Sequence, residues 1–140
     1  MVSDKQVEST TERVLAIRHS LLKLHKVLLE WERQAYERAH GRVESSYKVL
    51  HLVMNDPWFT WLHRLSELLV QMDEMLDQEK PPDKSDLSTL VDQTRALLTP
   101  SEVGSEFQRK YFIALQQSPD AVLAHAEVAK LLGKKPSRIH

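Results

Sequence analysis

The chain has 140 residues, with 19 basic and 20 acidic side chains that give a net charge of −1. It contains no cysteine, which excludes disulfides, a thiolate nucleophile and cysteine-bound zinc. Three glycines are few for a loop-rich or β-rich protein, and the length suits one domain. Abundant leucine, alanine, glutamate, lysine and arginine favour helices. The composition therefore predicts a single all-α domain.

The N-terminal sequence MVSDKQVESTTERV lacks the apolar segment of a secretory leader. No run approaches the roughly 18 consecutive apolar residues of a membrane-spanning helix. We therefore expect a soluble, cytoplasmic protein without membrane contact.

Charge is unevenly distributed along the chain. Residues 56–106 carry 4 basic and 11 acidic side chains, whereas residues 107–140 carry 6 and 2. We interpret the acidic segment as the solvated face of a pair of helices. The domain is expected to span residues 1–133, with residues 134–140 as a flexible basic tail. No wider basic stripe or interleaved aromatic residues accompany this tail, so a nucleic-acid partner is not expected.

The first predicted helix runs from a capping-box sequence at Ser9 to Gly41. Apolar residues alternate three and four positions apart along it, and a second apolar row follows at steps of seven. The first row is Val14, Ile17, Leu21, Leu24, Leu28, Trp31 and Ala35, and the second is Leu15, Leu22, Leu29 and Tyr36. A broad apolar stripe over roughly 30 residues, about 45 Å long, is typical of the central helix of a bundle.

A second helix is expected to begin after Ser45 or Ser46. Its apolar residues lie on nearly all sides, so it should be well buried. Asp56 and Pro57 mark another helix start, because Asp is a good N-cap and Pro suits the first helical position. This third helix should end near Gln78. Helices two and three are either separate or one kinked rod, since proline can bend a helix without ending it.

Three shorter helices are expected after the charged linker DQEKPPDKSD. Their starts are predicted at Ser85 or Asp86, at a capping box over residues 99–102, and at Ser118, and the last should end at Gly133. The predicted fold is an all-α helical bundle built on a long antiparallel helical hairpin closed by three shorter helices. Either the short helices cover the hairpin, or part of its apolar surface pairs with another chain.

Glu37 and His40 have the Glu-x-x-His spacing by which helical bundles hold paired metal ions. On a helical wheel of the first helix, both lie opposite the apolar stripe, and no facing helix supplies inward carboxylates. We therefore expect both side chains to face solvent, and we expect neither a metal ion nor another cofactor.

Arg18, His25 and Glu32 lie seven residues apart, between the two apolar rows of the first helix, and His125 lies among apolar residues of the last helix. Buried polar groups need hydrogen-bonding partners, because leaving them unpaired costs several kcal/mol. Three interpretations remain: a satisfied polar layer that sets helix register, a polar seam at a homodimer interface, or a ligand-binding pocket. These four residues are the ligand-binding candidates. An axial spacing of about 10.5 Å disfavours one ion shared by His25 and Glu32.

Phe59, Phe112 and Leu123 fall outside the apolar faces of their helices. Contiguous exposed apolar residues mark interfaces, so these three are the interface candidates. No glycine-rich phosphate loop, nucleophile elbow or carboxylate dyad is present, and no catalytic residue is assigned. The leading prediction is a non-catalytic bundle that binds protein, first of all a second copy of itself. The alternative is a bundle, catalytic or not, that binds a small molecule or metal through the four polar candidates.

The segments LLKLHKVLLEWERQAYERAHG, LVMNDPWFTWLHRLSELLVQMDEML and LQQSPDAVLAHAEV together resemble a family of small, uncharacterised, all-helical bacterial proteins. The resemblance covers most of the chain. It implies an all-helical fold and brings no activity, cofactor or functional residue with it.

Overall fold

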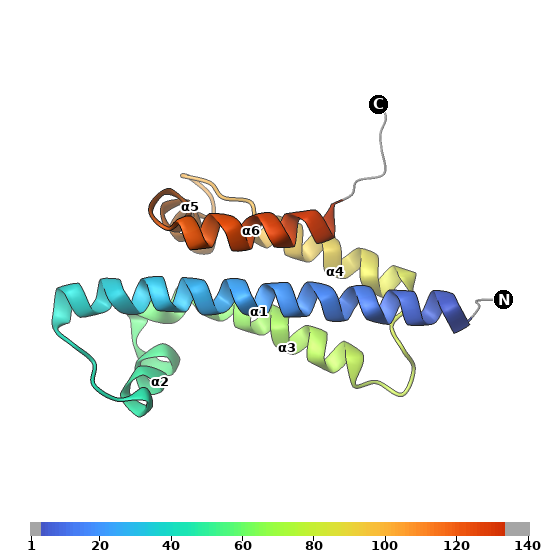
Figure 1. Ribbon diagram of the computed structural model, residues 1–140, viewed down its shortest axis with the longest axis horizontal. Coiled ribbons are helices and arrows are strands. Elements are labelled where there is room, and N and C mark those ends of the chain that lie inside the picture. Colours follow the sequence, from blue (N-terminus) through green and yellow to red (C-terminus); the bar gives the residue numbers. More distant parts are fainter. Residues whose placement is uncertain (1–3, 134–140) are drawn as a thin grey trace.

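The computed structural model describes residues 4–133, and this range is helical throughout apart from its loops (Figure 1). The tail predicted at residues 134–140 lies outside the described residues. The elements are α1 (Asp4–His40), α2 (Ser46–Asn55), the 3₁₀ helix η1 (Pro57–Leu62), α3 (His63–Leu76), α4 (Lys84–Leu97), α5 (Glu106–Gln117) and α6 (Pro119–Leu132). The predicted all-α bundle is confirmed.

The long helix α1 is the centre of the molecule. Figure 1 shows α6 on one side of α1 and α3 on the other, both running antiparallel to it. The α1–α3 pair is the expected hairpin, and α6 makes an even more extensive contact with α1. The short helices α4, α5 and α6 therefore cover the hairpin as a second layer.

The core contains the first apolar row of α1, as the sequence predicts. Its central members are essentially inaccessible to solvent: Val14, Ile17, Leu21, Leu24 and Leu28. Each such side chain contributes about 1.5–3 kcal/mol by its removal from water. The second row is less buried than predicted, because Leu15 and Leu22 are exposed. The apolar stripe that α1 buries is therefore narrower than its sequence suggests.

The two ends of α1 differ in how well the sequence locates them. The predicted start at Ser9 is wrong, since the helix passes through this residue and already includes Asp4. The predicted end is confirmed. Gly41 has φ of +96°, a conformation that side chains with a Cβ rarely adopt, and its N–H donates to the carbonyl of Glu37 at 2.8 Å.

A break at Asp56 separates α2 from the following helices. Ser45 caps α2 as predicted, by accepting a hydrogen bond from the N–H of Lys48. Asp56 then adopts an extended conformation (φ −87°, ψ 133°), and its carboxylate accepts from the N–H of Trp58. Helices two and three are therefore separate elements. The prediction that α2 is well buried is wrong, because none of its residues is buried.

Residues Pro57–Leu62 form a 3₁₀ helix in place of the first turns of the predicted α-helix. A 3₁₀ helix has 3.0 residues per turn instead of 3.6, so its side chains point in different directions from those on an α-helical wheel. Phe59, Trp61 and Leu62 are all buried as a result. From His63 on, α3 is α-helical and buries Leu65, Leu68, Leu69 and Met72 on one side.

The short helices begin with side-chain caps, although two of them do not begin where the sequence suggests. Helix α4 is capped by Asp83, which exchanges reciprocal hydrogen bonds with Asp86. Helix α5 is capped in the same way by Ser105 with Gln108, and not within residues 99–102.

Helix α6 has both of its predicted ends. Ser118 caps it with Pro119 in the first turn, and Gly133 follows its last residue. Within residues 4–133, no helix has the length and apolar character that crossing a bilayer requires.

Candidate functional site

The polar row of α1 faces α3 and η1, and each member that the sequence singles out has a partner on one of these two helices. Arg18 forms an ion pair with Asp73, and His25 Nε2 lies 3.0 Å from the hydroxyl of Ser66. Both pairs are spaced by seven residues on each helix, as an antiparallel arrangement requires. These contacts agree with a polar layer that sets the register of the two helices.

Glu32 is the most deeply buried member of this row, with 2% of its surface exposed. Its two carboxylate oxygens accept hydrogen bonds from two indole N–H groups, Trp58 Nε1 at 2.9 Å and Trp61 Nε1 at 2.5 Å. The carboxylate thereby connects α1 to two positions of η1 that lie one 3₁₀ turn apart. Both oxygens are occupied, so Glu32 presents no free ligand atom to a cavity.

His125 of α6 has a different partner on a different helix. Its Nδ1 lies 2.6 Å from the hydroxyl of Tyr111, which is completely buried on α5. Burial raises the pKa of Tyr111, so the phenol keeps its proton and can donate a hydrogen bond to Nδ1. Burial also lowers the pKa of His125. The sequence shows His125 on an apolar face, but nothing in it identifies Tyr111 as its partner.

The four ligand-binding candidates do not converge on one site. Arg18 and His25 contact different residues of α3, Glu32 contacts η1, and His125 of α6 contacts Tyr111 of α5. Among residues 10–133, whose side chains the structure describes, no three His, Cys, Asp or Glu side chains are grouped as metal ligands. A shared pocket for these four residues is therefore absent from the described part of the chain.

The Glu37 and His40 pair is split between two environments. His40 is exposed, as predicted, and its ring stacks on Tyr36 with centroids 4.4 Å apart. Glu37 is half-buried, which corrects the prediction that it faces solvent. Its carboxylate pairs with Arg33 Nη1 at 2.8 Å and accepts from the N–H of Val43 at 2.9 Å. Both side chains therefore contact residues at the C-terminal end of α1 or in the loop that follows it.

The three interface candidates differ in how much of each side chain is exposed to solvent. Phe59 is only 1% exposed, so its nomination as part of an exposed patch is wrong, and the 3₁₀ turn explains why. Phe112 is half-buried. Leu123 is 66% exposed on α6, where Val122 is also exposed.

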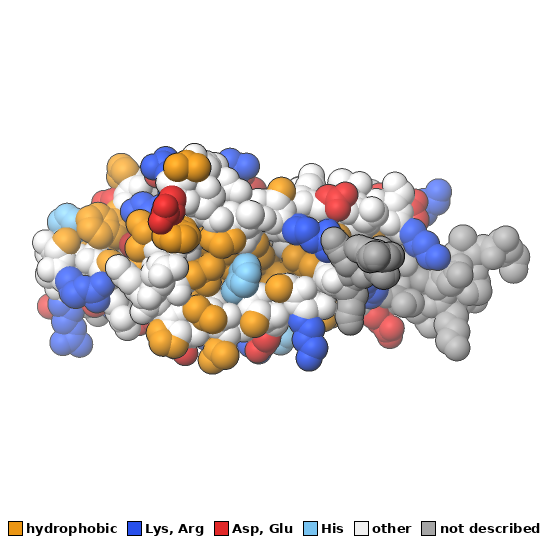
Figure 2. All heavy atoms as spheres, turned by 90° about the horizontal axis from the view of Figure 1, so that it is seen from above, with side chains coloured by type: hydrophobic (Ala, Val, Ile, Leu, Met, Phe, Trp, Pro, Cys, Tyr) orange, Lys and Arg blue, Asp and Glu red, His pale blue; other side chains and the backbone are white. Residues whose placement is uncertain are grey.

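Figure 2 shows the face formed by the short helices, with hydrophobic side chains gathered in a band along its middle and a histidine among them. The exposed hydrophobic residues of α5 and α6 are Ile113, Val122, Leu123 and Leu131. They are interspersed with charged residues such as Glu127, which pairs with Lys23 of α1. This face is therefore apolar in part and charged in part.

The most exposed apolar helix face in the described chain belongs to α2, which the sequence had placed in the core. Tyr47, Leu50 and Met54 are 76%, 56% and 61% exposed. They lie three and four residues apart and so share one side of the helix. The opposite side carries Leu52 and Val53, which pack against the core. Helix α2 therefore carries apolar residues on two opposite sides, and the rest of the protein covers only one of these sides.

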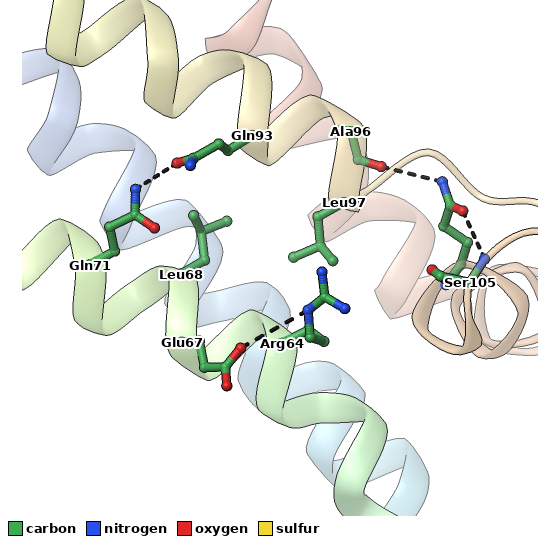
Figure 3. A pocket seen from close by; sticks show the side chains of 9 residues that line it. Arg64, Glu67, Leu68, Gln71, Gln93, Ala96, Leu97 and Ser105 are labelled. Carbon is green, nitrogen blue, oxygen red and sulfur yellow. Dashed lines mark hydrogen bonds and ion pairs between the residues drawn. The ribbon is translucent and has the colours of Figure 1, made fainter.

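A cleft of about 410 Å³ lies between α3, α4 and the start of α5 (Figure 3). Its floor includes Leu68 and Leu97. Around it, Gln71 donates to Gln93 at 2.6 Å, and the side chain of Gln108 donates to the carbonyl at the end of α4. These hydrogen bonds connect α4 to α3 and to α5, so we assign the cleft a structural role.

Comparisons of the chain with models of protein families, with curated proteins and with solved structures find no match. The resemblance to a family of small bacterial helical proteins accordingly stays a prediction.

Proposed function

We propose that this protein is a non-catalytic helical bundle that acts by binding another protein through the outer face of α2, and that its first partner is a second copy of itself. The observation that carries the proposal is the uncovered apolar face of Tyr47, Leu50 and Met54. Exposed apolar residues that cluster on one helix face, and not singly, are typical of protein interfaces.

The composition of α2 supports an interface. Six of its ten residues are apolar or aromatic, yet none is buried. Such a helix gains little from the fold that it belongs to, since isolated helices of this length are marginal in water. A partner that covers its outer face would supply the missing burial.

The charge of α2 supports a second copy as that partner. Lys48 is the only Lys, Arg, Asp or Glu residue of this helix, and the face of Tyr47, Leu50 and Met54 itself carries none. Two copies of such a face can meet across a twofold axis without opposing like charges at the centre. A strongly charged partner, by contrast, would find no complementary charge there.

The size of the face sets the expected strength of the association. A stable interface buries about 800 Å² on each partner. One ten-residue helix supplies only part of this area. We therefore expect a weak dimer that dissociates on dilution.

Analytical ultracentrifugation over a wide range of concentrations tests the proposal. The wild-type chain should show a reversible monomer–dimer equilibrium, and Leu50→Glu should shift it to the monomer, because the glutamate would be desolvated in the contact. Leu123→Glu is the matched control, since Leu123 is at least as exposed but lies on α6. It should leave the equilibrium unchanged.

Two outcomes would overturn the proposal. One is a wild-type monomer at every concentration. The other is an equilibrium that responds to Leu123→Glu and not to Leu50→Glu, which would move the interface to the α5–α6 face.

A further inference from the structure

A second cavity, of about 200 Å³, lies between the end of α4 and α6. Its walls are mainly apolar and come from Leu98, Pro100, Ala129 and Leu132. Binding sites for small molecules combine such walls with a few polar groups that orient the ligand. Three polar side chains also line the cavity: Arg95, Thr99 and His125. Thr99 donates to the carbonyl of Arg95 at 2.7 Å, and each of the other two is held by a contact with another helix.

The first polar group is the imidazole of His125. Its Nδ1 lies 2.6 Å from the hydroxyl of Tyr111, which is in the core and can donate a hydrogen bond to it. A neutral imidazole that accepts at one nitrogen carries its proton on the other. In that tautomer Nε2–H is the second donor of the ring, and His125 lines the cavity.

The second polar group is the guanidinium of Arg95 on α4. Its Nη2 donates to the carbonyl of Leu132 at 2.8 Å, which ties Arg95 to the C-terminal end of α6. Its Nη1 lies 3.8 Å from Asp92, whose side chain is largely exposed. Such an exposed, long ion pair is weak. The remaining N–H groups of Arg95 can therefore turn to an anion in the cavity.

We propose that this cavity binds a small organic carboxylate, with its carboxylate between the Arg95 guanidinium and His125 Nε2–H and its apolar body against Ala129 and Leu132. A guanidinium is the side chain best suited to a carboxylate, since it offers parallel N–H donors. The apolar walls select against a ligand that is charged throughout. This site is distinct from the α2 face and does not depend on self-association.

The volume of the cavity restricts the size of the ligand. Pockets for drug-sized molecules measure about 300–1,000 Å³, whereas this one measures about 200 Å³. A ring or short chain with one carboxylate suits it. Benzoate is therefore a suitable probe, and benzyl alcohol is a probe of similar shape without the charge.

Nuclear magnetic resonance titration of the ¹⁵N-labelled full chain with sodium benzoate tests the proposal. Saturable shifts should appear at the amides of residues 95–99 and 125–132. Benzyl alcohol should bind about fivefold more weakly, because it lacks the charge that pairs with Arg95. Arg95→Gln should weaken benzoate by a similar factor and leave benzyl alcohol unchanged.

Two further variants separate binding from folding. Arg109→Gln removes another arginine, on α5, that also bonds to a backbone carbonyl but does not line the cavity. It should leave benzoate binding unchanged. Ala129→Leu fills the cavity at an exposed position and should abolish the binding of both probes, even if Arg95→Gln proves unstable. Absence of saturable shifts near the cavity, or equal affinity for the two probes, would overturn the proposal.

Discussion

The carboxylate of Glu32 and the indole of Trp61 meet in the core at 2.5 Å, although the two residues are 29 positions apart. No ion pair to Glu32 is present among the described residues, so indole N–H groups alone serve its two oxygens. An acceptor with two lone pairs on each oxygen suits two donors that approach from different directions. The pair joins α1 to η1, just before α3 begins.

Glu32→Gln is expected to destabilise the fold by about 2 kcal/mol. The amide keeps one oxygen but turns an NH₂ group toward the second indole, so one buried N–H loses its acceptor. Urea denaturation followed by tryptophan fluorescence would measure the change in the free energy of unfolding. The exposed Glu44→Gln is the matched control and should be neutral. Equal stability of the two variants would contradict the structural role of Glu32.

Arg18→Gln is expected to cost only about 0.5 kcal/mol. Arg18 occupies the same row as Glu32, but its pair with Asp73 is partly open to solvent. Water screens such a pair and competes for both partners. The same denaturation experiment, repeated at high salt, should show the wild type and Arg18→Gln becoming more alike. A loss as large as that of Glu32→Gln would mean that the α1–α3 seam is more closed than described.

Stability is expected to fall as the pH drops below about 6.5, in part through His25. Burial lowers the pKa of His25 from its ordinary value of 6.5 in the folded protein. Below pH 6.5 the unfolded chain therefore takes up a proton before the folded chain does, which favours unfolding. Above pH 6.5 both states are neutral at this position, and His25 contributes no pH dependence.

Chemical denaturation between pH 5 and pH 8 would measure this dependence. His25→Gln should reduce the slope on the acid side, whereas the exposed His19→Gln should not. His125 should contribute in the same direction, because burial lowers its pKa as well. An unchanged slope in His25→Gln would contradict the burial of this imidazole.

Amide hydrogens of α2 are expected to exchange faster than those of the core helices. Helix α2 has no buried residue and is separated from η1 by the extended Asp56, so its opening disrupts fewer core contacts than that of α1 or α3 would. Hydrogen exchange followed by mass spectrometry would measure this for residues 46–55. If α2 pairs with a second copy, its protection should rise with protein concentration, while that of α6 should not. Protection equal to that of α1 in dilute solution would contradict the weak attachment of α2.

Gly41→Ala is expected to destabilise the protein by about 1 kcal/mol, because φ is +96° at this position. Nothing lies within 4 Å of the added Cβ, so the cost would come from the backbone and not from a clash. Gly41→Asn should cost less, since asparagine tolerates positive φ better than alanine. Thermal unfolding of the two variants would compare them. Equal losses would point to a cause other than backbone conformation.

The sequence predicts the parts of this fold that depend on regular helical phase. The buried row of α1, the seam of α3 and the ends of α6 follow from apolar spacing and from caps such as Ser118. The sequence also puts Arg18, His25 and Glu32 in one row of α1 between its apolar rows, and in the structure Arg18 and His25 meet α3. Phase gives the direction of a side chain from its own helix, but it cannot say which residue of another helix meets it. The partners Asp73, Ser66 and Trp58 are therefore known only from the structure.

The predictions that are wrong have identifiable physical causes. Phe59 was assigned to a surface because α-helical phase was applied to a 3₁₀ turn. Helix α2 was assigned to the core because apolar composition alone does not show whether enough partners exist to cover every side. Asp83 and Asp86 are both good caps, and only their reciprocal hydrogen bonds decide which residue begins α4. The cavity beside His125 depends on how α4 and α6 pack, which no local pattern encodes.

The path of the chain around α2 determines which changes of sequence this part of the fold can accommodate. The segment leaves the bundle after His40 and returns at Trp58, and the rings of these two residues touch, with centroids 5.2 Å apart. Residues 42–56 therefore leave the bundle and rejoin it at nearly the same point. A segment whose two ends lie close together can be shortened, lengthened or replaced without moving the helices on either side of it.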